Sequence, residues 1–360
     1  MKISVRHLHD FCAEALTRVG VGEVDARTTA EVLVTTDTWG TFTHGTKALR
    51  AYIRRLRGGG VRAQGQPKVV AEGPAWALVD GDSSLGMVSS VFAMNTAIAK
   101  AATAGIALVG LRNNCHYGAA GYYAAMAIDK NMIGLSMAND IPTVNAPGAR
   151  GSIMGSNPFG FAAPAGKEWP ILLDMATSTV AGGKVFAAAA LGKTIPGHWL
   201  VDADAKPTTN PTLFSHAASL TPLGGYKGYG LAFMIEVFAA LLTGASIRWQ
   251  VLSWTFSHPS KPTGHGAAFI AVNIASFIPV EHFKARMDQT IREVRASEKA
   301  DGADRIYLPG EMEWERREKA LVEGIDLPDD AVTSLRGLAD DLKLRCPFPK
   351  AISSPGAEPS

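Results

Sequence analysis

Four segments of this chain bring histidine, amide, hydroxyl and glycine residues together in patterns that suit chemistry. The first is Thr-His-Gly-Thr-Lys at 43–47, which precedes an arginine-rich stretch with helical character. A hydroxyl beside an imidazole, Thr43 next to His44, can act as an acid/base pair. The N-terminus of the following helix could hold an anion nearby. The alternative interpretation is that His44 only caps that helix, and the motif by itself fits both.

The second segment is Asn-Asn-Cys-His-Tyr-Gly-Ala-Ala-Gly at 113–121, between a predicted strand and a predicted helix. Such a turn exposes backbone N–H groups that commonly bind phosphate or carboxylate. His116 and the amides beside it are therefore either ligand contacts or loop residues that satisfy their own backbone.

The third segment joins Gly-Ser-Asn-Pro at 155–158 to Asp-Met-Ala-Thr-Ser at 174–178. Asp174 ends an apolar strand, where a carboxylate could hold a ribose hydroxyl or orient an imidazole. An aspartate in this position also commonly caps the next helix, which is the alternative interpretation.

The fourth segment, Leu-Gly-Gly-Tyr-Lys-Gly-Tyr-Gly at 223–230, opens an apolar helix. Its glycines let a ligand approach the backbone, and Lys227 at a helix N-terminus would strengthen an anion site. The spacing is not that of a phosphate loop, and no G-x-G-x-x-G occurs in the chain, so a Rossmann dinucleotide site is not predicted. No H-E-x-x-H or Cys-x-x-Cys motif is present, and no metal site is predicted.

Hydrophobic periodicity places these segments between helices and short strands. Leu8, Phe11, Cys12, Ala15 and Leu16 form one apolar helical stripe, with Ser4 as its predicted N-cap and Gly20 as its end. Further helices are predicted over 24–39, 46–56, 87–103, 120–129, 228–242, 280–295, 311–322 and 329–342. Strands are predicted over 68–71, 76–79, 106–111, 132–138, 171–174, 199–202 and 267–274.

This order predicts an α+β protein with a discontinuous helical domain made from both ends of the chain. We expect that domain to cover residues 1–65 and 280–345, with a sheet-containing domain inserted at 66–279. The Pro- and Ser-rich end, 346–360, is predicted to be a disordered tail.

Composition excludes several classes of function. The 360 residues carry 35 Lys and Arg against 33 Asp and Glu, so no bulk charge draws the protein to nucleic acid or to a membrane. The longest apolar run, 229–245, contains Glu236 and suits a buried helix better than a membrane span. Three widely spaced cysteines and an N-terminus without signal-peptide features lead us to expect a cytoplasmic protein.

Taken together, the ordered motifs resemble the type-2 malate/L-lactate dehydrogenase family. The resemblance covers residues 3–345 and rests on THG (43–45), YIRRL (52–56), NNCHYGAAGYY (113–123), GSNP (155–158), LLDMATSTVAGGK (172–184), KPTTNP (206–211), LGGYKGYGL (223–231) and LPGE (308–311). It implies a mainly antiparallel, non-Rossmann sheet domain that binds NAD or NADP, and a homodimer. It also implies hydride transfer between nicotinamide and C2 of a small 2-hydroxy or 2-oxo acid.

The resemblance assigns roles to residues that match the family's motifs. His44 corresponds to the acid/base histidine, with Thr43 as its hydroxyl partner, and His116 to the second catalytic histidine. The substrate-binding candidates are Lys47, Arg50, Tyr52 and Asn139. The cofactor-binding candidates are His116, Tyr117, Gly118, Ala119, Ala120, Asp174, Met175, Ala176, Tyr226, Lys227, Arg305, Leu308, Pro309, Gly310 and Glu311.

Three departures from the family pattern bear on the substrate. Ala48 stands where an arginine commonly binds the substrate carboxylate, so Lys47 or Arg50 would have to supply that charge. Tyr226 replaces a common histidine, and Lys184 stands where cyclic imino-acid reductases carry an aspartate. The alternatives to a hydroxy-acid dehydrogenase are a piperideine- or pyrroline-2-carboxylate reductase and a cofactor-binding paralogue without turnover.

Overall fold

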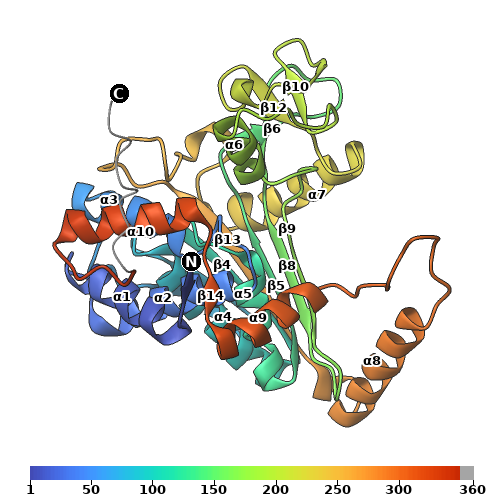
Figure 1. Cartoon of the computed structure of the whole chain (residues 1–360). Helices are drawn as coiled ribbons and strands as arrows, with labels where there is room; N and C mark the ends of the chain where they lie inside the picture. Colours follow the sequence, from blue (N-terminus) through green and yellow to red (C-terminus); the bar gives the residue numbers. More distant parts are fainter. Residues whose placement is uncertain (349–360) are drawn as a thin grey trace, which may run out of the picture.

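The computed structural model describes residues 1–348, and its centre is a seven-stranded sheet in the order β2-β3-β4-β13-β5-β8-β9 (Figure 1). Every neighbouring pair in it is antiparallel except β3 and β4, which run parallel. The strands are β2 (Lys68–Gly73), β3 (Trp76–Asp80), β4 (Ile106–Asn114), β13 (His265–Asn273), β5 (Met132–Ala138), β8 (Phe159–Ala163) and β9 (Ile171–Met175).

Strand β13 is apolar almost throughout because both of its faces are covered. Ala267, Phe269 and Ala271 belong to the main core, which includes apolar residues of α4 (Gly86–Ala104). The intervening Ala268 packs in a second cluster with Ile235 of α7 (Tyr226–Glu236). The alternation of side chains along a strand thus places helices on opposite sides of the sheet.

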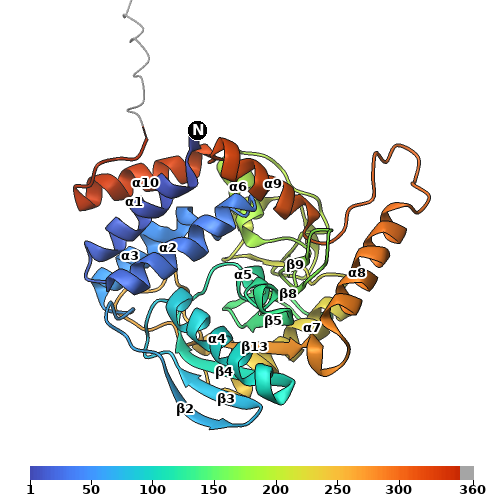
Figure 2. The same cartoon turned by 90° about the horizontal axis from the view of Figure 1, so that it is seen from below.

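The first and last helices of the chain pack beside each other (Figure 2). They are α1 (Val5–Thr17), α2 (Glu23–Thr38), α3 (Leu49–Gly58) and α10 (Asp329–Leu342). The predicted apolar stripe on α1 is confirmed as buried, and the hydroxyl of Ser4 accepts a hydrogen bond from the His7 N–H at 3.2 Å. Two short strands near the chain ends, β1 (Lys2–Ile3) and β14 (Ile325–Asp326), pair antiparallel.

A second, five-stranded sheet lies at the other end of the molecule, at the top of Figure 1. Its order is β11-β10-β12-β6-β7, from β11 (Pro207–Thr208), β10 (Leu200–Asp202), β12 (Ala218–Leu220), β6 (Pro142–Val144) and β7 (Met154–Gly155). Helix α6 (Gly182–Ala190) packs here through Val185, which shares an apolar cluster with Leu200 and Phe214.

The structure therefore contains both helices and mainly antiparallel sheets, as the sequence predicts. Helix α8 (Val280–Arg295) lies apart from α1 and α10 in both views, although its sequence was expected to join the same helical domain (Figures 1 and 2). Helix α9 (Glu311–Glu323) contacts α2. The domain boundaries stay predictions.

Several predicted elements differ in extent from those observed. The helix expected over 120–129 is α5 (Ala120–Ala125) followed by a 3-10 turn, and α7 continues as a π-helical turn, η4 (Val237–Leu241). Most of the predicted tail, 349–360, lies outside the described residues, whereas Phe348 is buried against the core. Within residues 1–348, none of the helices combines the length and apolar character of a membrane span.

Candidate active site

A buried carboxylate on α2, that of Asp37, holds the Thr-His-Gly-Thr turn in place. Asp37 accepts hydrogen bonds from the Thr46 backbone N–H at 3.1 Å and from its hydroxyl at 2.5 Å. A Cβ on Gly45 would lie 1.8 Å from Asp37 Oδ1, so only glycine fits there. Burial raises the pKa of Asp37 to about 7, against the lowering effect of the Thr46 bonds. No local sequence pattern marks Asp37, because its partner Thr46 lies outside α2.

Two imidazoles face each other next to this turn. The ring centroids of His44 and His116 lie 5.5 Å apart. Thr43 Oγ1 is 2.9 Å from His44 Nδ1, and Tyr52 Oη is 2.6 Å from His116 Nδ1. Each Nδ1 is thus engaged by a hydroxyl, which leaves the two Nε2 atoms as the nitrogens available to a ligand. The structure brings together four of the predicted site residues here.

A third histidine and an aspartate, which the sequence analysis did not assign to the site, adjoin this pair. His265 begins β13 and is only 2% exposed. Its ring centroid lies 6.4 Å from that of His116. His265 Nδ1 is 2.9 Å from the Thr263 hydroxyl, and Nε2 is 3.3 Å from Asp140 Oδ1. Asp140 is the second residue after a predicted strand, a position that could have marked it as a candidate.

Trp254 contributes an indole to the same cluster from the long loop before β13. Its ring stacks on His116 with a centroid separation of 4.3 Å and an interplanar angle of 12°. It also stacks on Tyr52 at 5.2 Å and 18°. No periodicity or motif marks Trp254 in the sequence, since the contact depends on the path of a loop.

Buried Arg55 fixes that loop to α3. Its Nε donates to the Trp254 carbonyl at 2.7 Å, Nη1 to the Lys261 carbonyl at 2.9 Å and Nη2 to the Ser253 carbonyl at 2.5 Å. Three carbonyl acceptors on one planar guanidinium specify the loop conformation, and hence the place of the indole.

The surroundings favour neutral imidazoles and distinguish the two catalytic candidates. Burial lowers the pKa of His44, while the Asp140 carboxylate acts in the opposite direction. Burial lowers the pKa of His116 well below its usual value, and the charged forms of His44 and His265 lower it further. His44 is therefore the more readily protonated of the two.

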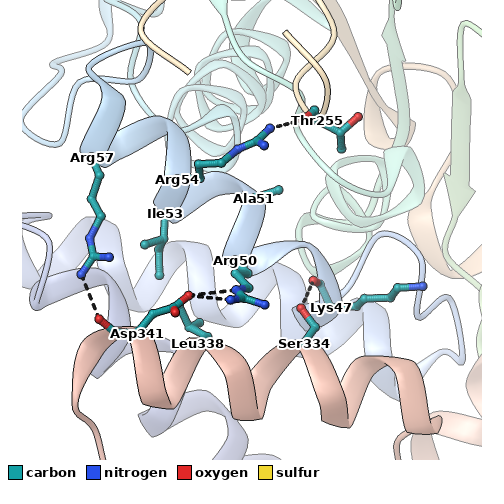
Figure 3. Close-up of a pocket in the computed structure, with 10 residues that line it drawn as sticks. All are labelled: Lys47, Arg50, Ala51, Ile53, Arg54, Arg57, Thr255, Ser334, Leu338 and Asp341. Atoms are coloured by element: carbon teal, nitrogen blue, oxygen red, sulfur yellow. Dashed lines mark hydrogen bonds and ion pairs between the residues drawn. The ribbon is translucent and has the colours of Figure 1, made fainter. Parts of the chain in front are cut away.

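The predicted substrate-binding residues other than Tyr52 lie elsewhere or have their polar groups engaged. The ammonium of Lys47 pairs with Asp330 of α10 at 2.5 Å. Arg50 pairs with Asp341 of α10 at 2.9 Å (Figure 3). Buried Asn139 donates to the Ser246 carbonyl at 2.8 Å and accepts from the Gly266 N–H at 2.8 Å, so its amide holds backbone segments.

The predicted cofactor-binding segments meet along β9. The N–H groups of Ala120 and Gly121 hydrogen-bond to the carboxylate of Asp174, and a Cβ on Gly121 would lie 2.8 Å from Asp174 Cβ. Asp174 therefore caps α5, an earlier helix, and not the next helix in the chain. The Leu172 N–H donates to the Pro309 carbonyl at 3.1 Å, which docks the 305–311 segment onto the same strand. Met175 and Ala176, both partly buried, continue that strand.

Charged residues hold the 305–311 segment in place. Glu311 is buried, pairs with Arg295 at 3.3 Å and accepts from the Leu308 N–H at 2.9 Å. Arg305 pairs with Glu315 and lies 4.1 Å above the ring of Tyr307. Gly310 has a φ of +88°, and its Cα faces the backbone of Leu172, so a side chain there would collide with β9.

The remaining predicted cofactor residues divide into buried and exposed ones. Tyr117, Ala119 and Ala120 are buried, and the Tyr117 ring stacks on Tyr123 in the core. Gly118, with a φ of +82°, lies at the turn beside the His44 carbonyl. Tyr226 is 71% exposed at the start of α7, next to Lys227.

The start of α7 is tied to the end of β9, because the Leu223 N–H donates to the Thr177 carbonyl at 2.9 Å. Gly224 and Gly225 also line a cavity of about 450 Å³. Among residues 1–348, no group of histidine, cysteine and acidic side chains is arranged to hold a metal ion.

Comparison with known proteins places this site in a family. A profile of the malate/L-lactate dehydrogenase family matches residues 3–336. Malate dehydrogenase of Pyrococcus horikoshii is 37% identical over 346 residues, which cover 94% of this chain and 95% of that protein. NAD(+)-dependent ureidoglycolate dehydrogenase of Escherichia coli K12 is 35% identical over 331 residues, 92% of this chain and 93% of that protein. The chain belongs to the malate/L-lactate dehydrogenase family of oxidoreductases.

The fold agrees with this assignment. The solved structure of the P. horikoshii malate dehydrogenase superposes with a TM-score of 0.88 at 34% identity and covers 96% of this chain and 97% of that one. The family likeness also extends to the imino-acid reductases. The pyrroline-2-carboxylate/piperideine-2-carboxylate reductase of Pseudomonas putida is 31% identical over 338 residues, 94% of this chain and 97% of that protein.

Proposed function

We propose that this protein transfers hydride between a nicotinamide cofactor, NAD or NADP, and C2 of a small 2-hydroxy or 2-oxo acid. The observation that carries the proposal is the facing pair of His44 and His116, each with its Nδ1 engaged by a hydroxyl. Such a pair can exchange one proton with the oxygen on C2. It needs no metal for that step.

The chain's residues fit a nicotinamide dinucleotide along β9. Arg295 Nε and Arg305 Nε are buried, and neither has a hydrogen-bond partner among the described residues. Nη atoms of both arginines pair with Glu168, Glu311 and Glu315, so it is the Nε donors that suit a ribose or phosphate oxygen. The bound cofactor would supply the hydride. In this proposal Asp174, Met175 and Ala176, the 117–120 turn, the 305–311 segment and Tyr226–Lys227 hold it.

We assign the proton transfer to His44. In the direction of reduction its Nε2 donates a proton to the substrate oxygen, and in the direction of oxidation it accepts that proton. Asp140 favours the charged form of His44 and so assists the acid. His116 stays neutral because its pKa lies well below the usual value, so it can orient the substrate oxygen by a hydrogen bond.

A cyclic imino-acid reductase is the second candidate, favoured by the P. putida relative. Its chemistry differs only in the acceptor, since the proton would go to the ring nitrogen and the hydride to the carbon of a C=N bond. Position 184 distinguishes the two candidates by residue type, since this chain has a lysine where the cyclic imino-acid reductases carry an aspartate. The neighbouring Gly183 lies against Thr43, so the segment that carries Lys184 packs beside the proposed acid/base pair.

The test is the loss of reduced-nicotinamide absorbance with NADH and with NADPH. Each cofactor is paired with pyruvate, oxaloacetate, sulfopyruvate, 2-oxoglutarate, diketogulonate and piperideine-2-carboxylate. We expect turnover on an open-chain 2-oxo acid. Turnover on the imine alone supports the second candidate. Absence of turnover on every substrate, with the reduced cofactor still bound, supports a paralogue that has lost catalysis.

We also propose that the protein is a homodimer through α7. This helix and η4 expose a continuous set of large apolar side chains, which a monomer rarely presents to water. They are Leu231, Phe233, Met234, Val237, Leu241 and Leu242. Sedimentation equilibrium should give a dimer for the wild type and a monomer for Leu241→Glu. Val322→Glu, at an exposed position of α9, is the matched control and should stay dimeric.

A further inference from the structure

A basic pocket lies on the other side of α3 from the two imidazoles. It has a volume of about 550 Å³ and lies between α3, α10 and Thr255 of the long loop (Figure 3). Lys47, Arg50, Arg54 and Arg57 line it, with Asp341 as the one carboxylate among its lining residues. A volume of this size suits a small metabolite.

The arginines form one face of α3 and differ in how their charge is compensated. Arg50, Arg54 and Arg57 recur at intervals of four and three residues, which places them on the same helical face. Asp341 neutralises Arg50 at 2.9 Å. Arg54 instead donates to the Thr255 carbonyl, and Arg57 donates to the Asp341 carbonyl at 3.3 Å.

Arg54 and Arg57 therefore line the pocket as cations that pair with carbonyl oxygens and not with a carboxylate. No ion pair of either residue occurs within residues 1–348. Both side chains are exposed, so their donors are accessible. Figure 3 shows the two guanidinium groups pointing apart, Arg54 toward Thr255 and Arg57 toward Asp341. A ligand that binds both therefore carries negatively charged oxygens at each of its ends, as pyrophosphate or a bisphosphate does.

The pocket shares two structural elements with the imidazole pair. The opposite face of α3 carries Tyr52, which is fully buried and bonded to His116. Thr255, whose carbonyl accepts from Arg54, directly follows Trp254, which stacks on His116. A ligand that binds the Arg54 guanidinium competes with the Thr255 carbonyl for its N–H donors. Binding in the pocket would therefore loosen the loop whose Trp254 stacks on His116.

We propose that this pocket binds a small phosphate-bearing anion through Arg54 and Arg57, and that its occupation releases the Thr255 segment from Arg54. The site is separate from the substrate and cofactor positions proposed above, and it does not depend on them. Its ligand is recognised by the charge and geometry of the phosphate group.

Calorimetric titration of the full-length protein with inorganic pyrophosphate at low salt tests the binding. We expect one site per chain in the wild type, and at least ten-fold weaker binding in the double variant Arg54→Gln/Arg57→Gln. The matched control is Arg27→Gln, which removes an exposed arginine of α2 that pairs with Glu23 at 3.0 Å. It should bind like the wild type.

The outcomes separate this pocket from other anion sites. Equal binding by the wild type and the double variant would place pyrophosphate elsewhere, for example at the proposed cofactor site, and would overturn the proposal. No binding by the wild type would overturn it as well. A parallel titration with malonate tests the ligand class, because a dicarboxylate that binds as tightly as pyrophosphate would contradict phosphate recognition.

Amide hydrogen exchange tests the effect on the loop. Pyrophosphate should speed exchange at 253–257 in the wild type and leave it unchanged in the double variant. If pyrophosphate binds through both arginines but exchange at 253–257 does not change, the proposed release of the Thr255 segment is wrong. Neither measurement uses catalytic turnover, so a failure of the proposed function would leave this test intact.

Discussion

At the scale of single residues, the proposed chemistry depends on two imidazoles whose surroundings shift their pKa values to different extents. His44 has a carboxylate, Asp140, that favours its charged form, whereas His116 faces two other imidazoles that disfavour charge. Similar side chains thus acquire different roles from their surroundings, because a pKa responds to burial and to neighbouring charge.

Replacement of His44 by alanine should lower turnover at least 100-fold, since general acid/base catalysis contributes on the order of 10²–10⁴. The measurement is steady-state turnover on the best substrate of the panel. His7→Ala, at an exposed position of α1, should leave turnover unchanged. Near-normal turnover of the His44 variant would remove this residue from the proton-transfer role.

The pH dependence of oxidative kcat/KM should show the effect of Asp140 on the pKa of His44. Oxidation requires neutral His44, and the pKa of His44 is lowered by burial, so oxidative kcat/KM should fall only at a pH below the usual histidine pKa of about 6.5. Asp140 acts against that lowering, so Asp140→Asn should move the acidic limb to still lower pH. A limb that stays in place, or moves to higher pH, would show that Asp140 does not stabilise the charged imidazole.

Much of the site could be predicted from the sequence, but not all of it. Thr43, His44 and His116 stand in motifs whose residue types indicate chemistry, and the structure brings them together. Trp254 and Asp37 could not be found in this way. Their roles depend on contacts between segments far apart in the chain, and no local pattern encodes those contacts.

At the scale of elements, α2, the 43–48 turn and α3 form one unit that positions the proposed acid/base pair. Asp37 joins the end of α2 to Thr46, while Arg55 joins α3 to the loop that carries Trp254. One buried polar side chain thus holds the 43–48 turn and another holds the loop beside it, in addition to apolar packing.

Gly45→Ala should destabilise the protein by at least about 2 kcal/mol, the scale of an overpacked buried site, because the added Cβ would meet Asp37 Oδ1. Urea denaturation measures this loss. Gly22→Ala is the control: no atom lies within 4 Å of its added Cβ, and the N-cap position of α2 should cost less than about 1 kcal/mol. Equal effects of the two substitutions would contradict the close contact.

Elements with strong periodicity were predictable, and most short or glycine-rich ones were not. The helix predicted over 329–342 is confirmed as α10, and the strand predicted over 132–138 is confirmed as β5. Helix α6 was missed because it starts with two glycines, which usually indicate a turn. In the five-stranded sheet, β10 was predicted as the strand over 199–202, but the other strands were missed. They span two or three residues each, too few for an alternating pattern.

At the scale of the whole molecule, the buried carboxylate of Asp37 links folding to pH. Its pKa rises from 3.8 to about 7 on folding, so the folded chain keeps a proton that the unfolded chain has released between these values. Stability from this group is present at low pH, falls as pH rises through this window and stays low above it.

Asp37→Asn removes this titration. From pH 5 to pH 8, the free energy of unfolding of the wild type should fall by roughly 2 to 3 kcal/mol relative to the variant, at 1.36 kcal/mol per unit of pKa shift. Urea denaturation of both proteins at the two pH values measures the difference. If the difference in the free energy of unfolding between the two proteins does not change with pH, Asp37 is ionised at both pH values, and its hydrogen bonds offset the cost of burying the charge.

The proposed hydride transfer has one direct test. The reduced cofactor is prepared with both hydrogens at C4 of the nicotinamide replaced by deuterium and is turned over with the 2-oxo acid that the panel identifies, and the product is examined by NMR. The proposed function predicts that deuterium appears on C2 of the hydroxy acid, while the new hydroxyl proton comes from water. Product without deuterium on C2, with the label retained in the cofactor or lost to solvent, would contradict direct hydride transfer in this site.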